Sequence, residues 1–209
     1  METFIILIFQ LAVLLMSVVI HEFAHSWMAF RLGDSTAKNY GRLTLNPLKH
    51  LDFWGSFLVP LMIFLFSGGR AIFGWAKPVP FNPHNLRDQH WGIAKVAIAG
   101  PSANLLVALV FGLGLRFLPG QFLVSSGLVQ IFSLIVFLNI LLAIFNLIPL
   151  PPLDGSKILF ALLPHSLEDV RIFLERYGML FLLLFIFFAF QWILPLVFII
   201  YNLIVGLPL

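Results

Sequence analysis

The chain has 209 residues, of which 61% are hydrophobic and 10% charged, and its mean hydropathy is +1.04. A water-soluble domain is about half apolar and a quarter charged, so the composition excludes such a domain and indicates an integral membrane protein. The chain has no cysteine, which excludes disulfides and thiolate metal sites. The formal net charge is +3, and no pattern of basic and aromatic residues suggests a nucleic-acid partner.

The first predicted element is a transmembrane helix. Residues 3 to 20 carry no charge, and a helix that continues to about residue 30 is long enough to cross a bilayer once. The segment starts Met1-Glu2, without a basic region, and shows no small-residue cleavage site. We therefore expect a retained helix and not a cleaved signal peptide.

Two polar connections then flank a short apolar run. Residues 31 to 52 and 70 to 90 are basic and rich in turn residues, whereas residues 53 to 69 are apolar but interrupted by Gly55 and Pro60. Basic connections on both sides are simplest if both face the cytoplasm. We therefore predict that the apolar run dips into the bilayer and returns, or packs as a short helix, without crossing.

The second half contains three long apolar segments. Residues 91 to 118 and 126 to 148 are predicted helices, and residues 178 to 206 form a third segment that contains Pro195. This last segment crosses once with a kink at Pro195 or turns back there as a hairpin.

Together these elements predict an all-α polytopic membrane protein with about four to six transmembrane helices. A short re-entrant or extended segment separates the first helix from the 91–118 helix. The longest polar connections are about twenty residues, so we expect residues 1–209 to form one membrane-embedded domain.

The motif HEFAH, residues 21 to 25, indicates a metal site. His21 and His25 lie four positions apart, so a helix presents both imidazoles on one face, and Glu22 lies beside them. In this pattern the metal lowers the pKa of a bound water to about 7 and polarises a carbonyl, while the glutamate takes the proton. Histidine and carboxylate ligands suit Zn²⁺, although iron or cobalt could occupy the same site. The alternative is a hydrogen-bonded cluster without metal.

Asp154 is the best candidate for a third ligand, since a catalytic zinc usually has three from the protein. It follows an apolar helix in NLIPLPPLDG, where prolines prevent a regular helix and Gly155 gives the backbone freedom. The alternative is that Asp154 caps a helix over residues 155 to 163. The other candidates lie in polar segments, where we expect solvated or turn-forming side chains: His50, His84, His90, His165, Asp52 and Asp88.

This ligand set constrains the topology. Both histidines lie near the C-terminal end of the first helix, and Asp154 lies just past the C-terminal end of the 126–148 helix. An even number of crossings must separate them, and the 91–118 and 126–148 helices supply two. We therefore expect residues 40 and 160 on one face of the membrane, and the site toward the cytoplasm.

The chain resembles the site-two protease family of intramembrane zinc metalloproteases, in its compact prokaryotic form without a PDZ domain. The resemblance covers most of the length and rests on five ordered motifs: HEFAH at 21–25, GRLTLNPLKHLD at 41–52, FGWAKPVPFNP at 73–83, GPSAN at 100–104 and NLIPLPPLDG at 146–155. It implies that His21, His25 and Asp154 bind zinc and that Glu22 is the catalytic base. It also implies that Asn146 positions the substrate or the attacked carbonyl. Asn104 is a weaker candidate for this, since it could equally pack helices.

These observations predict an intramembrane zinc metalloprotease of the cell membrane, with zinc-activated water as the attacking group and Glu22 as general base and acid. Its expected partners are transmembrane protein substrates and the lipid bilayer. Residues 73 to 83 resist helix formation and either pair with an unwound substrate as an extended edge or form a rigid turn below the site. The alternative functions are a metal transporter, disfavoured because polar residues are not spread across the bilayer depth, and an inactive helix-binding relative, disfavoured by Glu22.

Overall fold

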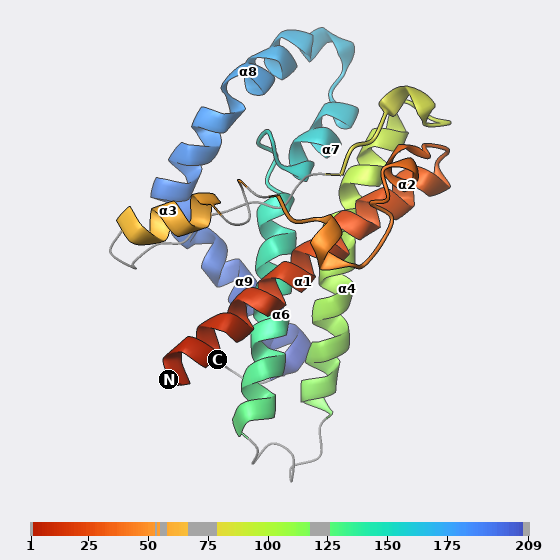
Figure 1. The fold of residues 1–209 in the computed structure, drawn as a ribbon. Helices are drawn as coiled ribbons and strands as arrows, with labels where there is room; N and C mark the ends of the chain where they lie inside the picture. The colour runs from red at the N-terminus through yellow and green to blue at the C-terminus, as the bar shows by residue number, and fades with distance from the viewer. Residues whose placement is uncertain (1, 53, 55–57, 67–78, 118–125, 207–209) are drawn as a thin grey trace.

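The computed structural model describes residues 2–52, 54, 58–66, 79–117 and 126–206. All regular elements in these residues are helices (Figure 1). The α-helices are α1 (Glu2–Arg31), α2 (Thr36–Asn39), α3 (Val59–Phe66), α4 (Trp91–Arg116), α6 (Ser126–Asn146), α7 (Asp154–Leu162), α8 (Glu168–Leu184) and α9 (Ile193–Val205). Short 3₁₀ turns are η1 (Pro47–Lys49), η3 (Pro83–Asn85), η4 (His165–Leu167) and η6 (Phe190–Trp192), and η5 (Phe185–Ala189) is a π-helical turn.

Four helical runs are long and apolar enough to cross a membrane: Ile8–Arg31, Trp91–Arg116, Gly127–Asn146 and Glu168–Val205. Lipid offers the backbone no hydrogen-bond partners, so an apolar chain at this depth satisfies its peptide groups within helices. The prediction of an all-α polytopic membrane protein is confirmed.

The centre of the bundle is α4, which packs against α1, α6 and α9 (Figure 1). Apolar side chains of α4, α6 and α9 form the largest buried cluster, which consists of Ala108, Leu115, Val136, Ile140, Ile193, Val197, Tyr201 and Val205. A smaller cluster joins Ala29 of α1 to Leu86, which follows η3, and to Val96 of α4. The smaller cluster holds the C-terminal end of α1 against α4, near the candidate site.

The apolar run between the polar connections contains a short helix, α3. Its eight residues span about 12 Å, which is too short to cross the bilayer. Its length agrees with the expectation of a short helix, while residues 53, 55–57 and 67–69 of that run lie outside the described part of the chain.

The last helical run continues from α8 through η5 and η6 into α9, so the hairpin alternative at Pro195 is wrong. The irregular turns lie just before Pro195 and not at it. Proline has no N–H for the carbonyl of residue 191 and its ring crowds that carbonyl, so the distortion falls on the N-terminal side. The run also begins earlier than residue 178, because Arg171 pairs with Glu168 and Glu175 on one helix face.

The prolines after α6 fold the chain back so that α7 starts against the end of α6. Gly155 lies so close to this turn that a Cβ there would meet the backbone carbonyls of Leu147 and Ile148. A side chain larger than hydrogen would push α7 away. This close approach brings Asp154 to the level of the two histidines.

Candidate metal centre

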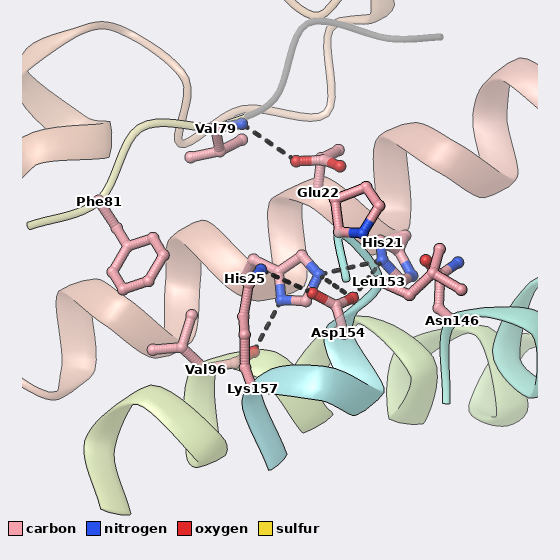
Figure 2. Close-up of a pocket in the computed structure, with 11 residues that line it drawn as sticks. His21, Glu22, His25, Val79, Phe81, Val96, Asn146, Leu153, Asp154 and Lys157 are labelled. Atoms are coloured by element: carbon pink, nitrogen blue, oxygen red, sulfur yellow. Dashed lines mark hydrogen bonds and ion pairs between the residues drawn. The ribbon is translucent and has the colours of Figure 1, made fainter. Parts of the chain in front are cut away.

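Three side chains from two distant segments converge on one point (Figure 2). The Nε2 atoms of His21 and His25 in α1 are 3.0 Å apart. The Oδ2 atom of Asp154, at the start of α7, is 3.1 Å from Nε2 of His21 and 2.9 Å from Nε2 of His25. Among the described residues, this is the group of histidine and acidic side chains arranged closely enough to hold a metal ion.

The lone pairs of the three ligand atoms are arranged to bind a cation. Nδ1 of His25 lies 2.7 Å from the carbonyl of Val96, and Nδ1 of His21 lies 2.6 Å from Oδ1 of Asn104. Both partners accept, so in the neutral imidazoles the proton is on Nδ1 and the lone pair is on Nε2. Two lone pairs and a carboxylate oxygen then face one another within 3.1 Å. A tetrahedral zinc would hold such atoms about 3.3 Å apart, so the residues present fit the ion with a small expansion.

Asp154 does not cap α7 with its side chain. It is the first helical residue, the N-cap is Leu153, and the structure records no side-chain capping bond there. Its Oδ1 atom instead accepts a hydrogen bond of 3.0 Å from Nζ of Lys157, one turn later. The two oxygens of the carboxylate therefore have different partners: Oδ1 is bonded to Lys157, and Oδ2 is directed at the histidines.

Glu22 lies beside this cluster without joining it. Its Oε2 atom accepts a hydrogen bond of 3.2 Å from the backbone N–H of Val79, in the connection before α4 (Figure 2). It faces a cavity of about 180 Å³. The residues lining this cavity are His21, Glu22, His25, Val79, Phe81, Val96, Asn146, Pro152, Leu153, Asp154 and Lys157.

Asn146, at the end of α6, also lines the cavity. One hydrogen of its Nδ2 group is donated to the carbonyl of Leu142 at 2.9 Å. The remaining amide hydrogen and Oδ1 have no role in that bond. Asn146 can therefore offer a polar group to a molecule in the cavity.

The connection before α4 reaches the cavity through Val79 and Phe81. Residues 73–78 of the predicted extended segment lie outside the described part of the chain, and residues 79 to 82 adopt no regular structure. Their position at the cavity is consistent with both alternatives, an edge that pairs with substrate and a turn that packs at the site.

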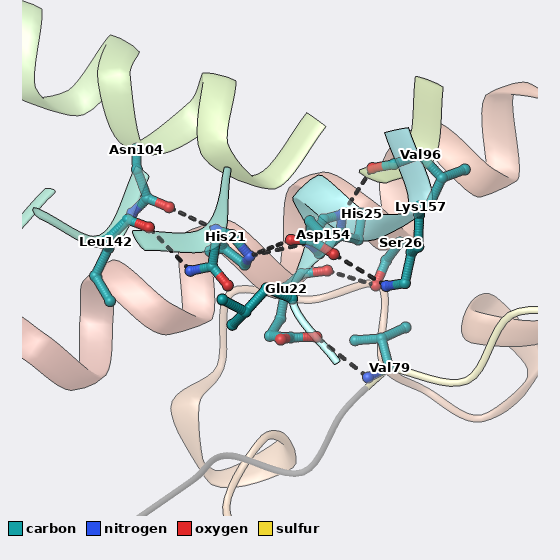
Figure 3. Close-up of polar contacts among 12 residues, drawn as sticks. His21, Glu22, His25, Ser26, Val79, Val96, Asn104, Leu142, Asp154 and Lys157 are labelled. Atoms are coloured by element: carbon teal, nitrogen blue, oxygen red, sulfur yellow. Dashed lines mark hydrogen bonds and ion pairs between the residues drawn. The ribbon is translucent and has the colours of Figure 1, made fainter. Parts of the chain in front are cut away.

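The sequence did not predict how three residues, Asn104, Asn139 and Gly100, lie against the histidines or their partners. Asn104, fully buried, bonds to His21 (Figure 3). Asn139, also fully buried, bonds to Asn104. A Cβ on Gly100 would lie 2.6 Å from Cε1 of His21 and would also meet Nε2 of His25. Motif GPSAN contains two of these residues, but their contact with the histidines depends on how α4 packs against α1.

Of the two alternatives expected for His50, solvated or turn-forming, the turn-forming one is confirmed. His50 ends the η1 turn, as a turn-forming residue would, but its side chain is fully buried and its Nε2 lies 2.9 Å from the carbonyl of Thr44. The polar connection that contains His50 therefore buries this side chain. His84 and His90 are exposed, and Asp88 accepts hydrogen bonds from the first N–H groups of α4.

Comparison with known proteins gives matches over most of the chain. The model of Peptidase family M50 matches residues 9–124 and 120–188. YwhC of Bacillus subtilis, named as a zinc metalloprotease, is 42% identical over 179 residues, which are 83% of this chain and 78% of that protein. Rip2 of Mycolicibacterium smegmatis and MJ0611 of Methanocaldococcus jannaschii, named in the same way, are 36% and 31% identical over 72% and 68% of this chain.

The match covers 54% of the mycolicibacterial protein and 63% of the methanocaldococcal one, so this chain spans little more than half of some relatives. No solved structure matches the chain.

Proposed function

This chain belongs to peptidase family M50 and is a zinc metalloprotease, and from that premise we propose that it hydrolyses peptide bonds within or beside the transmembrane segments of other membrane proteins. The observation that carries the proposal is the convergence of His21, His25 and Asp154 beside Glu22, in one cavity among apolar helices. Ionisable residues in such a place are costly and mark function.

His21, His25 and Asp154 would hold the zinc. When bound, zinc acts as a Lewis acid that makes water a stronger acid and polarises the scissile carbonyl. The protein contributes the orientation of the ligands. Lys157 holds one oxygen of Asp154, so the other oxygen stays directed at the histidines.

Glu22 would move the proton. It lies next to His21 in sequence and faces the same cavity, but its carboxylate does not belong to the ligand group. It takes a proton from the attacking water as the C–O bond forms, and it gives that proton to the nitrogen as the C–N bond breaks. The hydrogen bond from Val79 N–H keeps the carboxylate oriented toward the cavity between turnovers.

Asn146 would stabilise the oxygen of the attacked carbonyl. Its side chain lines the cavity from α6, and one amide hydrogen is left after the bond to Leu142. A donor directed at a developing oxyanion contributes about 3 to 4 kcal/mol in comparable sites.

A substrate helix must expose a peptide bond to reach this cavity, because its carbonyls are bonded internally in the bilayer. The segment around Val79 lies at the cavity and has backbone groups that could pair with an unwound strand. We propose that the protein resides in the cell membrane with this cavity open to the cytoplasm, the side to which the basic connections point.

One structural observation disfavours the metal-transporter alternative. An ion path needs charged or ligating groups at several depths. Within the described helices, the buried polar residues below the site are Ser17, Asn104 and Asn139, which are uncharged and bonded to one another. The other alternative, an inactive relative that binds helices, differs from the protease in one testable property, which is whether peptide bonds are cleaved.

The substitution Glu22→Gln tests the proposal. It removes the base while leaving the three ligands, so we expect zinc content to stay at the wild-type level and cleavage to fall by about 10² to 10⁴-fold. Quantitative proteomics of membrane-protein fragments from cells with either form measures cleavage, and metal analysis of the purified protein measures zinc. Glu168→Gln, an exposed carboxylate on α8, is the matched control. Equal fragment patterns in wild type and Glu22→Gln would refute the proteolytic role.

A further inference from the structure

A chain of hydrogen bonds leads from His21 through three helices. Nδ1 of His21 bonds to Oδ1 of Asn104 in α4 at 2.6 Å (Figure 3), and Nδ2 of Asn104 donates to Oδ1 of Asn139 in α6 at 2.8 Å. Nδ2 of Asn139 donates to Oγ of Ser17 in α1 at 2.8 Å. The side chains of Asn104 and Asn139 are both 0% exposed, so water cannot substitute for any of these partners.

Backbone carbonyls fix which atom donates and which accepts in each of these hydrogen bonds. Oγ of Ser17 donates to the carbonyl of Val13, so it accepts from Asn139. The second hydrogen of Asn139 Nδ2 goes to the carbonyl of Ile135. Carbonyls only accept, so the Asn139 amide nitrogen is committed and its Oδ1 must face Asn104.

The same reasoning orients Asn104. Its Nδ2 group donates to Oδ1 of Asn139 and to the carbonyl of Ser17 at 3.2 Å. Both amide hydrogens are then used, and only Oδ1 is left for His21. An oxygen there accepts, so Nδ1 of His21 must carry the proton and Nε2 must carry the lone pair.

We propose that Asn104 and Asn139 are positioning residues that set the tautomer of His21, so that its Nε2 lone pair faces the metal. This inference rests on the proposed zinc site and deepens it. Outer partners of a metal-binding histidine fix its ring and its tautomer in this way.

The contrast between the two histidines explains the need for the chain of bonds. His25 bonds to the backbone carbonyl of Val96, which can only accept. His21 bonds instead to a side-chain amide, which can present either its oxygen or its nitrogen. A rotated Asn104 amide would donate to Nδ1 and move the proton to Nε2, where it would block the metal. Asn139 and the carbonyl of Ser17 prevent this rotation.

Zinc affinity, measured by competition with a chelator in detergent, tests the proposal. Asn104→Leu removes the acceptor, and we expect about 10 to 100-fold weaker binding. Asn104→Asp keeps an oxygen toward His21 but loses both donors, so it should unfold at lower temperature while binding zinc at least about tenfold more tightly than Asn104→Leu. Asn202→Leu, an exposed asparagine on α9, should bind zinc as the wild type does.

A second readout needs no metal. Side-chain ¹⁵N NMR of the zinc-free protein, recorded in alkaline solution so that the imidazoles are neutral, should show His21 as the Nδ1-protonated tautomer in the wild type and in Asn104→Asp, and a mixture in Asn104→Leu. Asn139→Leu removes one of the two acceptors that hold the Asn104 amide, and we expect zinc affinity and tautomer between those of the wild type and Asn104→Leu. If Asn104→Leu does not fold, Asn139→Leu replaces it in both measurements.

The outcomes separate this inference from the metal site itself. If His21→Ala abolishes zinc binding but the Asn104 and Asn139 variants match the wild type in affinity and tautomer, the positioning role is refuted and the site stands. If His21→Ala binds zinc as the wild type does, the proposed site fails.

Discussion

Asp34 is a fully buried carboxylate that ties the connection before α4 to the end of α1. Its oxygens accept hydrogen bonds from N–H of Thr36 at 3.1 Å, from N–H of Asn82 at 2.7 Å and from Nδ2 of Asn85 at 2.9 Å. Asn82 follows Val79 and Phe81, which line the candidate site. The carboxylate therefore anchors the segment that reaches Glu22.

The stability of the protein should depend on the ionisation of Asp34. Burial raises the pKa of Asp34, but the hydrogen bonds from Thr36, Asn85 and Asn82 outweigh it, so its pKa lies below the ordinary value. The contribution of the carboxylate is present above the unfolded-state pKa of about 3.9 and is lost as the pH falls through the lower folded-state pKa. At neutral pH, Asp34→Asn should unfold at a lower temperature, because its free energy of unfolding is expected to fall by about 1 to 3 kcal/mol.

Thermal unfolding in detergent between neutral pH and about pH 3 measures this effect. Asp34→Asn should lose less additional stability in acid than the wild type does. Asp169→Asn, an exposed acid on α8, serves as the control. A variant as stable as the wild type at neutral pH would contradict the anchoring role.

At the level of single residues, the sequence allowed the candidate metal-binding group to be predicted because its signals are local. The spacing of His21 and His25 defines a helix face, and Asp154 stands out after a run of prolines. Asn139 carried no such signal, and Asn104 was only a weaker candidate within GPSAN. An asparagine in an apolar helix has the same appearance whether it packs helices or bonds to a histidine, and only the register between α1, α4 and α6 distinguishes the two.

At the level of elements, the approach of α4 to α1 depends on Gly100. An added Cβ there would lie 2.6 Å from Cε1 of His21 and would meet Nε2 of His25. Gly100→Ala should displace both imidazoles and weaken zinc binding at least about tenfold, while alanine favours the helix itself.

Zinc titration of Gly100→Ala, with circular dichroism to follow helix content, tests this expectation. Gly127→Ala is a matched control, because no atom lies within 4 Å of a Cβ at that position of α6. Unchanged zinc affinity in Gly100→Ala would show that α4 can retreat without disturbing the histidines.

The helices themselves were predicted well where an apolar run is long and ends at prolines or charges. The start of α8 was missed because residues 166 to 176 are charged, and the pairing of Arg171 with two glutamates favours a helix there. Helix packing could not be predicted either. The membrane helices are apolar on nearly all sides, so periodicity does not reveal which face meets which neighbour.

At the scale of the whole molecule, the ligand geometry predicts a topology. Tyr40 and Leu162 are exposed, at 71% and 63%, and should lie on the same side of the membrane as the site, whereas Gly127 at the start of α6 should lie on the other side. The chain has no cysteine of its own. Single substitutions Tyr40→Cys, Leu162→Cys and Gly127→Cys can therefore be labelled in intact cells and in inverted vesicles with an impermeant maleimide.

We expect the first two cysteines to react only in inverted vesicles and the third only in intact cells. Gly127→Cys is the internal control for sidedness. Reaction of Tyr40→Cys and Leu162→Cys from opposite faces would contradict the arrangement of crossings deduced from the ligands.

The polar chain through α1, α4 and α6 also bears on how the protein is made. Asn104 of α4 and Asn139 of α6 leave the translocon with amide groups whose remaining partners lie on another helix, and hydrocarbon offers no substitute. Each bond between helices contributes about 0.6 to 2 kcal/mol in a membrane, so an early intermediate without α6 carries orphaned amides. Full pairing of these side chains therefore requires that α6 is inserted beside α1 and α4.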